Sequence, residues 1–479
     1  MKMNFFTVAA LALCLGFTAC SDDEPELNGG NENGTETEVG TVAVKNGSFK
    51  AYLHAQDYHF TENGELIQDD KVLSTTALDL TGLKMNDLSD IKLFPNVNYV
   101  DLSDNGYGPV FDFTILPEQI TGVDLTGNEI SEYKNLIKFE VAENGEETIT
   151  TLRDLKILYL PHETKDNMFD LVRYYRQNEE AITKGDIDMQ MADEKGKLAK
   201  YTTLRTIADP VLAAHLNKIF GSIFTDGKID LSKRLNKEEK LNGVIINPYQ
   251  EIENYDKLAS LEGIQYIIHN PYWEGTSITI QYTDMELPKL VVPASVTMID
   301  INKADASKGF DLSNATGLIQ LYLRDVKGIE TIDLSKNKVW GQRDKLTEEN
   351  GFGTTLSLLG CPNVKTILFP EAKELRAYTF DIESLPALET CDLSKFVYMH
   401  GLSIGNLSDS YNLVFPNIVE FPTQPEGVPR PMDVLLFGCS EKTYNLPATT
   451  EFINKYKNYN GARKIMKGRL KYDTDKYWR

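Results

Sequence analysis

Short apolar triplets that recur along the chain constrain its fold more than any other feature of the sequence. Between Phe310 and Asn337 the spacing apolar-x-x-apolar-x-Leu occurs twice, at Leu318, Leu321 and Leu323 and again at Ile329, Ile332 and Leu334. The tripeptide Asp-Leu-Ser at Asp311 returns at Asp333, 22 residues later. Alternate residues of a strand point to opposite faces, so each triplet places two apolar side chains inside and the residue between them outside. A unit this small cannot bury its own apolar side chains, and the sequence therefore predicts an α/β fold of short parallel strands stacked turn upon turn.

Further triplets occur in both halves of the chain. They are Leu78/Leu80, Val97/Val100/Leu102, Ile120/Val123/Leu125, Leu155/Leu158/Leu160, Val296/Ile299/Ile301, Val364/Ile367/Phe369, Leu375/Tyr378/Phe380 and Leu388/Cys391/Leu393. Three of the triplets are followed by an asparagine, at Asn105, Asn128 and Asn337. An inward asparagine can satisfy backbone groups of adjacent turns with its two donors and its acceptor. We therefore expect these three asparagines to be structural.

The triplets and their period resemble leucine-rich repeats, which implies a solenoid with one strand from each turn in a single sheet. Phe224–Ile229 is similar to Phe60–Ile67, and Ser260–Ile267 is similar to Asp87–Phe94. Both sets resemble the N-terminal cap of bacterial surface leucine-rich repeat proteins, a group that includes internalin-like adhesins. The resemblance implies two modules with short helical caps, residues 41–205 and residues 206–479. One continuous solenoid with a helical insertion is the alternative.

The segment between the expected modules breaks the period. Residues from Asp166 to Glu180 have helical spacing, whereas Thr183–Thr203 is polar and rich in Gly, Asp and Lys, which favours an exposed linker. A second helix is expected after Asp209, with Asp209 as its cap and Pro210 in its first turn. A fragment starting near Lys200 should then fold alone, and proteases should cut within Thr183–Thr203.

The first forty residues read as a processing and anchoring segment. Residues 1–19 form a short apolar signal, and small residues precede Cys20, as in a lipoprotein signal peptide with Cys20 as the lipidated residue. Residues 20–40 are an acidic, disordered tether that begins Cys-Ser-Asp-Asp-Glu. This start resembles the export signal of Bacteroidetes-type surface lipoproteins, which implies an outer-membrane lipoprotein exposed at the cell surface.

Charge and cysteine usage exclude several classes of partner and site. The 479 residues carry a net charge of −22, which argues against nucleic acid and against anionic membrane surfaces. Contact with a membrane is therefore expected only through the lipid on Cys20. Beyond Cys20 the cysteines are Cys361, Cys391 and Cys439, with no C-x-x-C, so we expect buried free thiols and no zinc site.

No motif for catalysis or cofactor binding stands out. G-x-S-x-G, the P-loop and H-E-x-x-H are absent, and the turns at Glu62–Glu65 and Asp226–Lys228 lack most ligand positions of a calcium loop. His54 and His59 have no third ligand beside them in the sequence. The basic run Asn460–Arg479 fits a terminal cap and tail. We expect no metal, no cofactor and no enzymatic activity.

What remains is the outward face of the expected solenoid. Tyrosine and arginine are enriched in binding hot spots, and the outward candidates are Tyr99, Tyr159, Tyr322, Arg324 and Arg376. The sequence therefore favours a lipid-anchored adhesion protein that binds an extracellular protein or glycan on a concave face. Two alternatives stay open: an extracellular enzyme acting on polysaccharide or peptide, with its site in Lys138–Thr150 or Gly405–Pro431, and a structural subunit of an envelope complex.

Overall fold

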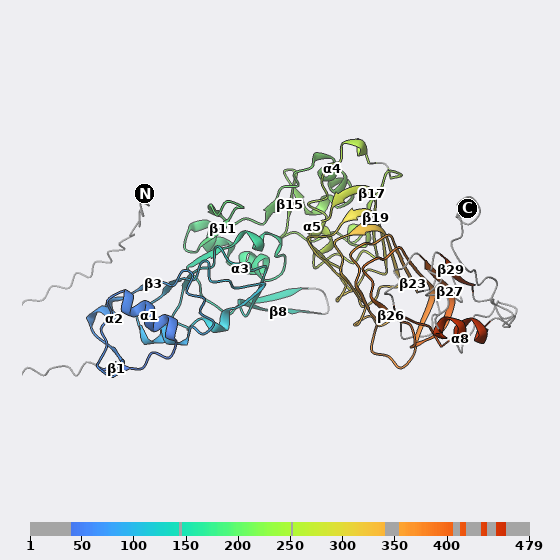
Figure 1. Ribbon diagram of the computed structural model, residues 1–479. Helices are drawn as coiled ribbons and strands as arrows, with labels where there is room; N and C mark the ends of the chain where they lie inside the picture. The colour runs from blue at the N-terminus through green and yellow to red at the C-terminus, as the bar shows by residue number, and fades with distance from the viewer. Residues whose placement is uncertain are drawn as a thin grey trace, which may run out of the picture.

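The chain has a mixed α/β fold with many parallel strands and few helices (Figure 1). The computed structural model describes residues 40–142, 146–250, 252–340, 354–405, 412–417, 433–437 and 447–456. Two large sheets dominate these residues, each with its own apolar core, and neither sheet closes on itself. The expected concave face is therefore an open sheet face.

The first large sheet has six strands in the order β12-β11-β10-β6-β4-β3. Its strands are β3 (Ala77–Asp79), β4 (Tyr99–Asp101), β6 (Gly122–Asp124), β10 (Ile157–Leu160), β11 (Asp188–Ala192) and β12 (Leu198–Lys200). All neighbours pair parallel except β11 and β12, which are antiparallel. The apolar residues of the first-half triplets form its core.

The second large sheet has eight strands, all parallel, in the order β16-β17-β19-β21-β23-β25-β27-β29. Its strands are β16 (Val244–Ile246), β17 (Ser277–Glu286), β19 (Met298–Asp305), β21 (Gln320–Lys327), β23 (Thr355–Leu359), β25 (Leu375–Glu383), β27 (Phe396–Gly405) and β29 (Asp433–Phe437). Strand order follows chain order, so each turn lies beside the one before it.

The single-sheet expectation is wrong in the second half, because successive triplets lie on different sheets. The triplet at Leu318 is on β21, but the triplet at Ile329, 11 residues later, is on β22, which pairs only with β24. Half a turn separates them, so the chain has crossed to the opposite side of the core. These small parallel pairs are β18 (Leu290–Val291) with β20 (Phe310–Asp311), β22 (Thr331–Asp333) with β24 (Thr366–Leu368), and β26 (Thr390–Asp392) with β28 (Asn412–Val414).

The recurring Asp-Leu-Ser tripeptide ends strands with one repeated turn. The aspartate Oδ1 accepts a hydrogen bond from the backbone N–H two residues later, where Ser or Thr stands, at 2.7 to 3.1 Å. Such Asx turns satisfy a backbone donor where the ladder stops. The aspartates are Asp79, Asp101, Asp112, Asp124, Asp230, Asp305, Asp311, Asp333 and Asp392. These nine aspartates therefore have a structural role at strand ends.

The three asparagines after the triplets are buried and join neighbouring turns. Asn105 donates to the carbonyls of Leu80 and Ser103, each at 3.0 Å. Asn128 repeats the arrangement with the Leu102 carbonyl, at 3.0 Å. Asn337 donates to Leu318 O at 2.8 Å and accepts from the backbone N–H groups of Val339 and Trp340. Each side chain thus holds backbone groups that would otherwise lack partners.

Replacing Asn337 with leucine is expected to lower the free energy of unfolding by about 1–3 kcal/mol, because it leaves these backbone donors and acceptors unsatisfied. Thermal unfolding of the variant measures the loss. Exposed Asn314 on the preceding turn is the matched control, and Asn314→Leu should leave the melting temperature unchanged. An unchanged melting temperature for Asn337→Leu as well would contradict a structural role.

Two capped helices stand ahead of the two large sheets. Helix α1 (Gly47–Ala55) begins after Asn46, whose side chain accepts from the Phe49 N–H. Helix α4 (Pro210–Ile219) begins after Asp209, which accepts from two N–H groups of its first turn, as the sequence predicted. The other α-helices among the described residues are α2 (Asp70–Ser74), α3 (Asp170–Lys184), α5 (Gln265–Ile268) and α8 (Pro447–Tyr456). No helix within the described ranges is long and apolar enough to cross a bilayer.

The expected linker at Thr183–Thr203 is wrong, because the segment contains strands β11 and β12 of the first sheet. β11 pairs with β10 on one side and β12 on the other. Met189 and Tyr201 are buried in the first core. The Gly, Asp and Lys residues that suggested a linker lie in the turns before β11 and between β11 and β12.

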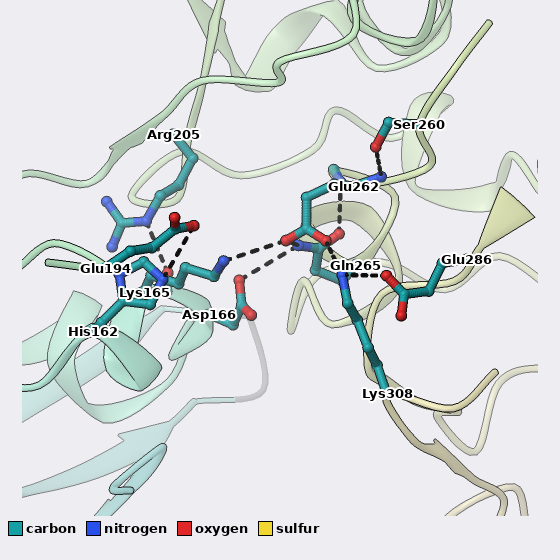
Figure 2. Close-up of polar contacts among 11 residues, drawn as sticks. His162, Lys165, Asp166, Glu194, Arg205, Ser260, Glu262, Gln265, Glu286 and Lys308 are labelled. Atoms are coloured by element: carbon teal, nitrogen blue, oxygen red, sulfur yellow. Dashed lines mark hydrogen bonds and ion pairs between the residues drawn. The ribbon is translucent and has the colours of Figure 1, made fainter. Parts of the chain in front are cut away.

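Helix α3 is shared between the two cores. Its Leu171 and Tyr174 pack in the first core, while Val172, together with Met168 just before the helix, packs in the second. Polar contacts join the same region: Lys165 Nζ lies 3.4 Å from Glu262 Oε1, and Glu262 also faces Lys308 (Figure 2). The two sheets therefore meet through a packed junction.

A second junction cluster surrounds Glu147. The antiparallel hairpin of β8 (Ile137–Val141) and β9 (Glu147–Thr151) lies in the segment Lys138–Thr150 and extends toward the second sheet (Figure 1). Only 3% of the Glu147 side chain is exposed, and it accepts from Arg173 at 2.8 Å and from Tyr272 at 2.8 Å. Arg176 and Arg234 lie within 3.3 Å of Oε2, the oxygen that also accepts from Tyr272. Burial opposes ionisation, yet these donors outweigh it and lower the pKa of Glu147 to about 2.

Candidate functional site

The five outward residues expected to bind ligand lie in three separate places. Tyr99 and Tyr159 are on the first sheet, on β4 and β10. The Tyr159 hydroxyl donates to Asp188 Oδ2 at 2.7 Å, and the Tyr99 ring lies over Gly122, where an added Cβ would come within 2.8 Å of it. Burial, with nearby carboxylates, raises the pKa of both phenols. Both tyrosines are thus held by their own sheet.

Tyr322 and Arg324 lie together on β21, on the outward face of the second sheet. The register places Tyr322 between Asp300 and Ser357, and places Arg324 between Asn302 and Leu359. A cavity of about 160 Å³ opens there, lined by Gln281, Tyr282, Asp300, Asn302, Tyr322, Leu323, Arg324, Ser357 and Leu359. The structure therefore brings two of the five expected residues into one hollow.

Arg376 lies apart from that hollow. It stands near the start of β25, opposite Tyr398, and does not line the cavity. Its guanidinium is mostly buried and pairs with Glu374 at 3.3 Å. Strand β25 lies two strands from β21, and the residue of β25 in register with Tyr322 is Asp381. Arg376 comes five residues before Asp381, so it lies away from the site.

Two polar side chains of the cavity lining differ in their hydrogen bonding. Asp300 Oδ2 accepts a short hydrogen bond from Gln281 Nε2. Burial raises the pKa of Asp300, while that hydrogen bond and the charge of Arg324 oppose the rise. Asn302 beside it is 5% exposed, and its Oδ1 has no hydrogen-bond partner. Such an acceptor is costly to leave unpaired, because it has lost water without gaining a protein donor.

A bulge in β17 builds the rim of the cavity. Between the pairs Gln281↔Asn302 and Met285↔Ala304, three residues of β17 face the single residue Lys303 of β19. Between β19 and β21 there is no such excess, because Lys303 alone faces Asp325 alone. Tyr282 in this bulge has φ 60° and is 44% exposed, an uncommon backbone conformation for an aromatic residue. The two added residues aim its ring outward at the mouth of the cavity.

A second exposed tyrosine extends the rim. Tyr249 is 80% exposed, and its ring centroid lies 6.2 Å from that of Tyr282, with the planes nearly perpendicular. Large exposed aromatic side chains that meet beside a polar hollow are typical of recognition surfaces. The cavity and these two rings form one continuous feature, the Tyr282 site.

One further acidic group lies on the same face, beyond the cavity. Burial and the nearby Glu383 raise the pKa of Asp381 on β25 to about 6. Asp381 is three strands away from Asp300, which at ~4.8 Å per strand separates the carboxylates by about 14 Å. Paired carboxylates in glycoside hydrolysis stand roughly 5–10 Å apart. Asp300 and Asp381 therefore do not form such a pair.

A larger hollow, of about 820 Å³, lies beside the first sheet among the loops before its strands. Its Arg153 donates to the carbonyls of Leu116, Pro117 and Ile120 and so holds the loops together. None of the buried, unpaired polar side-chain atoms in the described ranges belongs to its lining. It lacks the unpaired buried group that distinguishes the Tyr282 site.

Metal and thiol chemistry have little support in the part of the chain that the structure describes. No group of three or more His, Cys, Asp or Glu side chains there is arranged to hold a metal ion. Cys361 and Cys391 are buried thiols, and burial raises the pKa of the Cys361 thiol to about 11. Such a thiol is a poor nucleophile at neutral pH. Cys20 and Cys439 lie outside the described residues, as does most of Gly405–Pro431.

Four of the site's residues have no direct signal in the sequence. Gln281, Tyr282, Asp300 and Asn302 follow no recognisable motif, and the bulge that aims Tyr282 is visible only from the strand register. One trace existed: the alternation of polar and apolar residues along Ser277–Thr283 breaks at Asp284, inside the bulge. No protein-family model matches the chain, and no curated protein sequence matches it.

Proposed function

We propose that this chain is a surface-exposed lipoprotein that binds an extracellular ligand on the outward face of its eight-stranded sheet. The observation that carries the proposal is the Tyr282 site, where an unpaired buried acceptor, a cavity and two exposed aromatic rings meet. The cavity is smaller than the 300–1,000 Å³ typical of sites for whole small molecules. It suits one protruding group of a larger ligand.

Leucine-rich repeat architecture in two capped modules remains part of this proposal. Strand order that follows chain order, the repeated Asx turns and the buried asparagines support it. The two capped helices and the hairpin of β14 (Phe224–Thr225) and β15 (Lys228–Asp230) after α4 support a second cap. A rigid stacked sheet keeps outward side chains at fixed spacing, which suits recognition of an extended ligand.

Binding accounts for the site better than catalysis does. The two carboxylates with raised pKa on this face, Asp300 and Asp381, are about 14 Å apart, too far to act together on one bond. The segment Lys138–Thr150, an alternative location for an active site, is a hairpin whose Glu147 is occupied by arginines. That carboxylate serves the junction.

The anchoring part of the proposal is tested by fractionation. Cys20→Ala should move the protein from the membrane fraction to the soluble fraction, because the lipid is the proposed anchor. In intact cells that carry the unaltered protein, added protease should degrade it while a periplasmic marker survives. Retention of Cys20→Ala in membranes, or protection of the protein in intact cells, would contradict surface anchoring through Cys20.

A further inference from the structure

The Tyr282 site defines what its occupant must supply. The unpaired Oδ1 of Asn302 calls for a hydrogen-bond donor from the ligand, since the surrounding sheet provides none. The carboxyl group of Asp300, beside it, is a second acceptor, and burial raises its pKa. One of its oxygens accepts a hydrogen bond from Gln281. The deepest part of the hollow is therefore rich in acceptors.

Donors on the two neighbouring strands flank Asn302 in the same hollow. Arg324 presents a guanidinium from an exposed position on β21, and Gln281 presents an amide from β17. The Tyr322 hydroxyl is hydrogen-bonded to the Thr355 side chain, so its ring contributes a flat wall. A ligand group that both donates and accepts within a few ångströms would match these surroundings. Hydroxyl groups do both.

The charge of the hollow selects against ions. Asp300 and Arg324 are the charged residues of the lining, one of each sign. An ammonium group would face Arg324 and a carboxylate would face Asp300, so a charged ligand gains at one wall and loses at the other. A neutral ligand loses at neither.

The rim adds a requirement for a flat apolar surface. The Tyr249 and Tyr282 rings are exposed and lie at right angles to each other at the mouth. The left-handed backbone conformation of Tyr282 has a cost in free energy, and such strain gathers at ligand clamps. Because the ring is exposed, its packing in the free protein offsets little of this free energy. A ligand with an apolar face would pack on it.

We propose that the Tyr282 site binds one neutral sugar ring of a glycan chain. The hydroxyls of a hexose or pentose meet Asn302, Asp300 and Arg324 in the hollow, and the C–H face of that ring or the next one packs on Tyr282 and Tyr249. This assignment rests on the proposed ligand-binding function and names the class of ligand. A peptide side chain is the competing occupant, and the experiment separates the two.

The test is affinity electrophoresis of the full chain, released in soluble form by Cys20→Ala. Native gels contain one polysaccharide each: neutral glucan, mannan, galactan or xylan, and acidic polygalacturonate. The variant Asn302→Leu keeps the branching of the side chain but removes the unpaired acceptor, and Tyr282→Gly removes the ring and relieves the strain of the backbone at that position. Leu368→Ser, at an exposed position on β24 outside the large sheet, is the control.

The expected result is retardation by at least one neutral polysaccharide and none by polygalacturonate. Asn302→Leu and Tyr282→Gly should each raise the dissociation constant at least tenfold, with melting temperatures equal to or above that of the parent. Leu368→Ser should bind as the parent does. Equal melting temperatures exclude misfolding as the reason for lost binding.

Three results would overturn the assignment. They are no retardation by any neutral polysaccharide, stronger retardation by polygalacturonate, and unchanged binding in both site variants. A peptide array bound by the parent and not by Tyr282→Gly would refute the sugar while sustaining ligand binding at this face. Failure of surface anchoring is read separately, from protease treatment of intact cells.

Discussion

Glu147→Gln is expected to lower the free energy of unfolding by about 3–5 kcal/mol. The substitution keeps the side-chain shape but leaves Arg173, which is 6% exposed, buried beside a neutral amide. Arg176, Arg234 and Tyr272 lose their charged acceptor at the same time. Chemical denaturation measures the loss. Glu180→Gln, in an exposed ion pair with Lys184 on helix α3, is the control and should change stability little.

The same carboxylate predicts how stability depends on pH. The pKa of Glu147 in the folded chain is about 2, below its ordinary value of 4.5. Its contribution is therefore fully present above pH 4.5 and is lost as the pH falls from 4.5 toward 2. The shift corresponds to about 3 kcal/mol. Glu147→Gln should flatten the stability profile in that window, and an unchanged profile would show that the arginines do not stabilise the charge.

The second large effect concerns the junction at helix α3. A fragment of residues 200–479 is expected to unfold at a far lower temperature than the full chain, in contrast to the independent folding that the sequence suggested. It lacks Met168 and Val172, which are buried in the second core and contribute about 1.5–3 kcal/mol each. It also lacks Glu147, the partner of Arg234 and Tyr272.

A fragment of residues 161–479, which retains Met168 and helix α3, is the comparison and should recover part of the loss. Limited proteolysis of the full chain should cut the exposed turn at residues 193–197 and spare the paired strands β11 and β12. Equal melting temperatures for the 200–479 fragment and the full chain would show that α3 adds nothing to the second core.

Local sequence signals predicted the elements whose stabilising interactions lie close together in the chain. The triplet at Val97 predicted strand β4, and the cap at Asp209 predicted helix α4. Both signals could be recognised because alternation and capping depend on only a few neighbouring residues. Strand β11 was missed although Asp188–Ala192 alternates polar and apolar residues. Methionine at its inward positions and flanking Gly, Asp and Lys residues concealed the pattern.

Long-range register decided the rest. Nothing in the sequence near Ile329 says that half a turn moves its triplet to a different sheet, because both strands carry the same pattern. For the same reason, only part of the candidate site could be predicted from the sequence. Tyr322 and Arg324 stand out as outward residues of a clear triplet, whereas Asn302 becomes significant only once its neighbours fail to pair with its oxygen.

The shared helix also determines how the molecule would transmit force. If the chain is anchored before residue 40 and binds its ligand on the eight-stranded sheet, as proposed, tension between a cell and its target would run through the first sheet, across α3 and the Glu147 cluster, and into the second. These contacts act in parallel with the backbone that connects the two sheets. They would be stretched together, side chains from both cores resisting at once, so the junction would yield as one cooperative unit while the strands beyond it keep the ligand face in register.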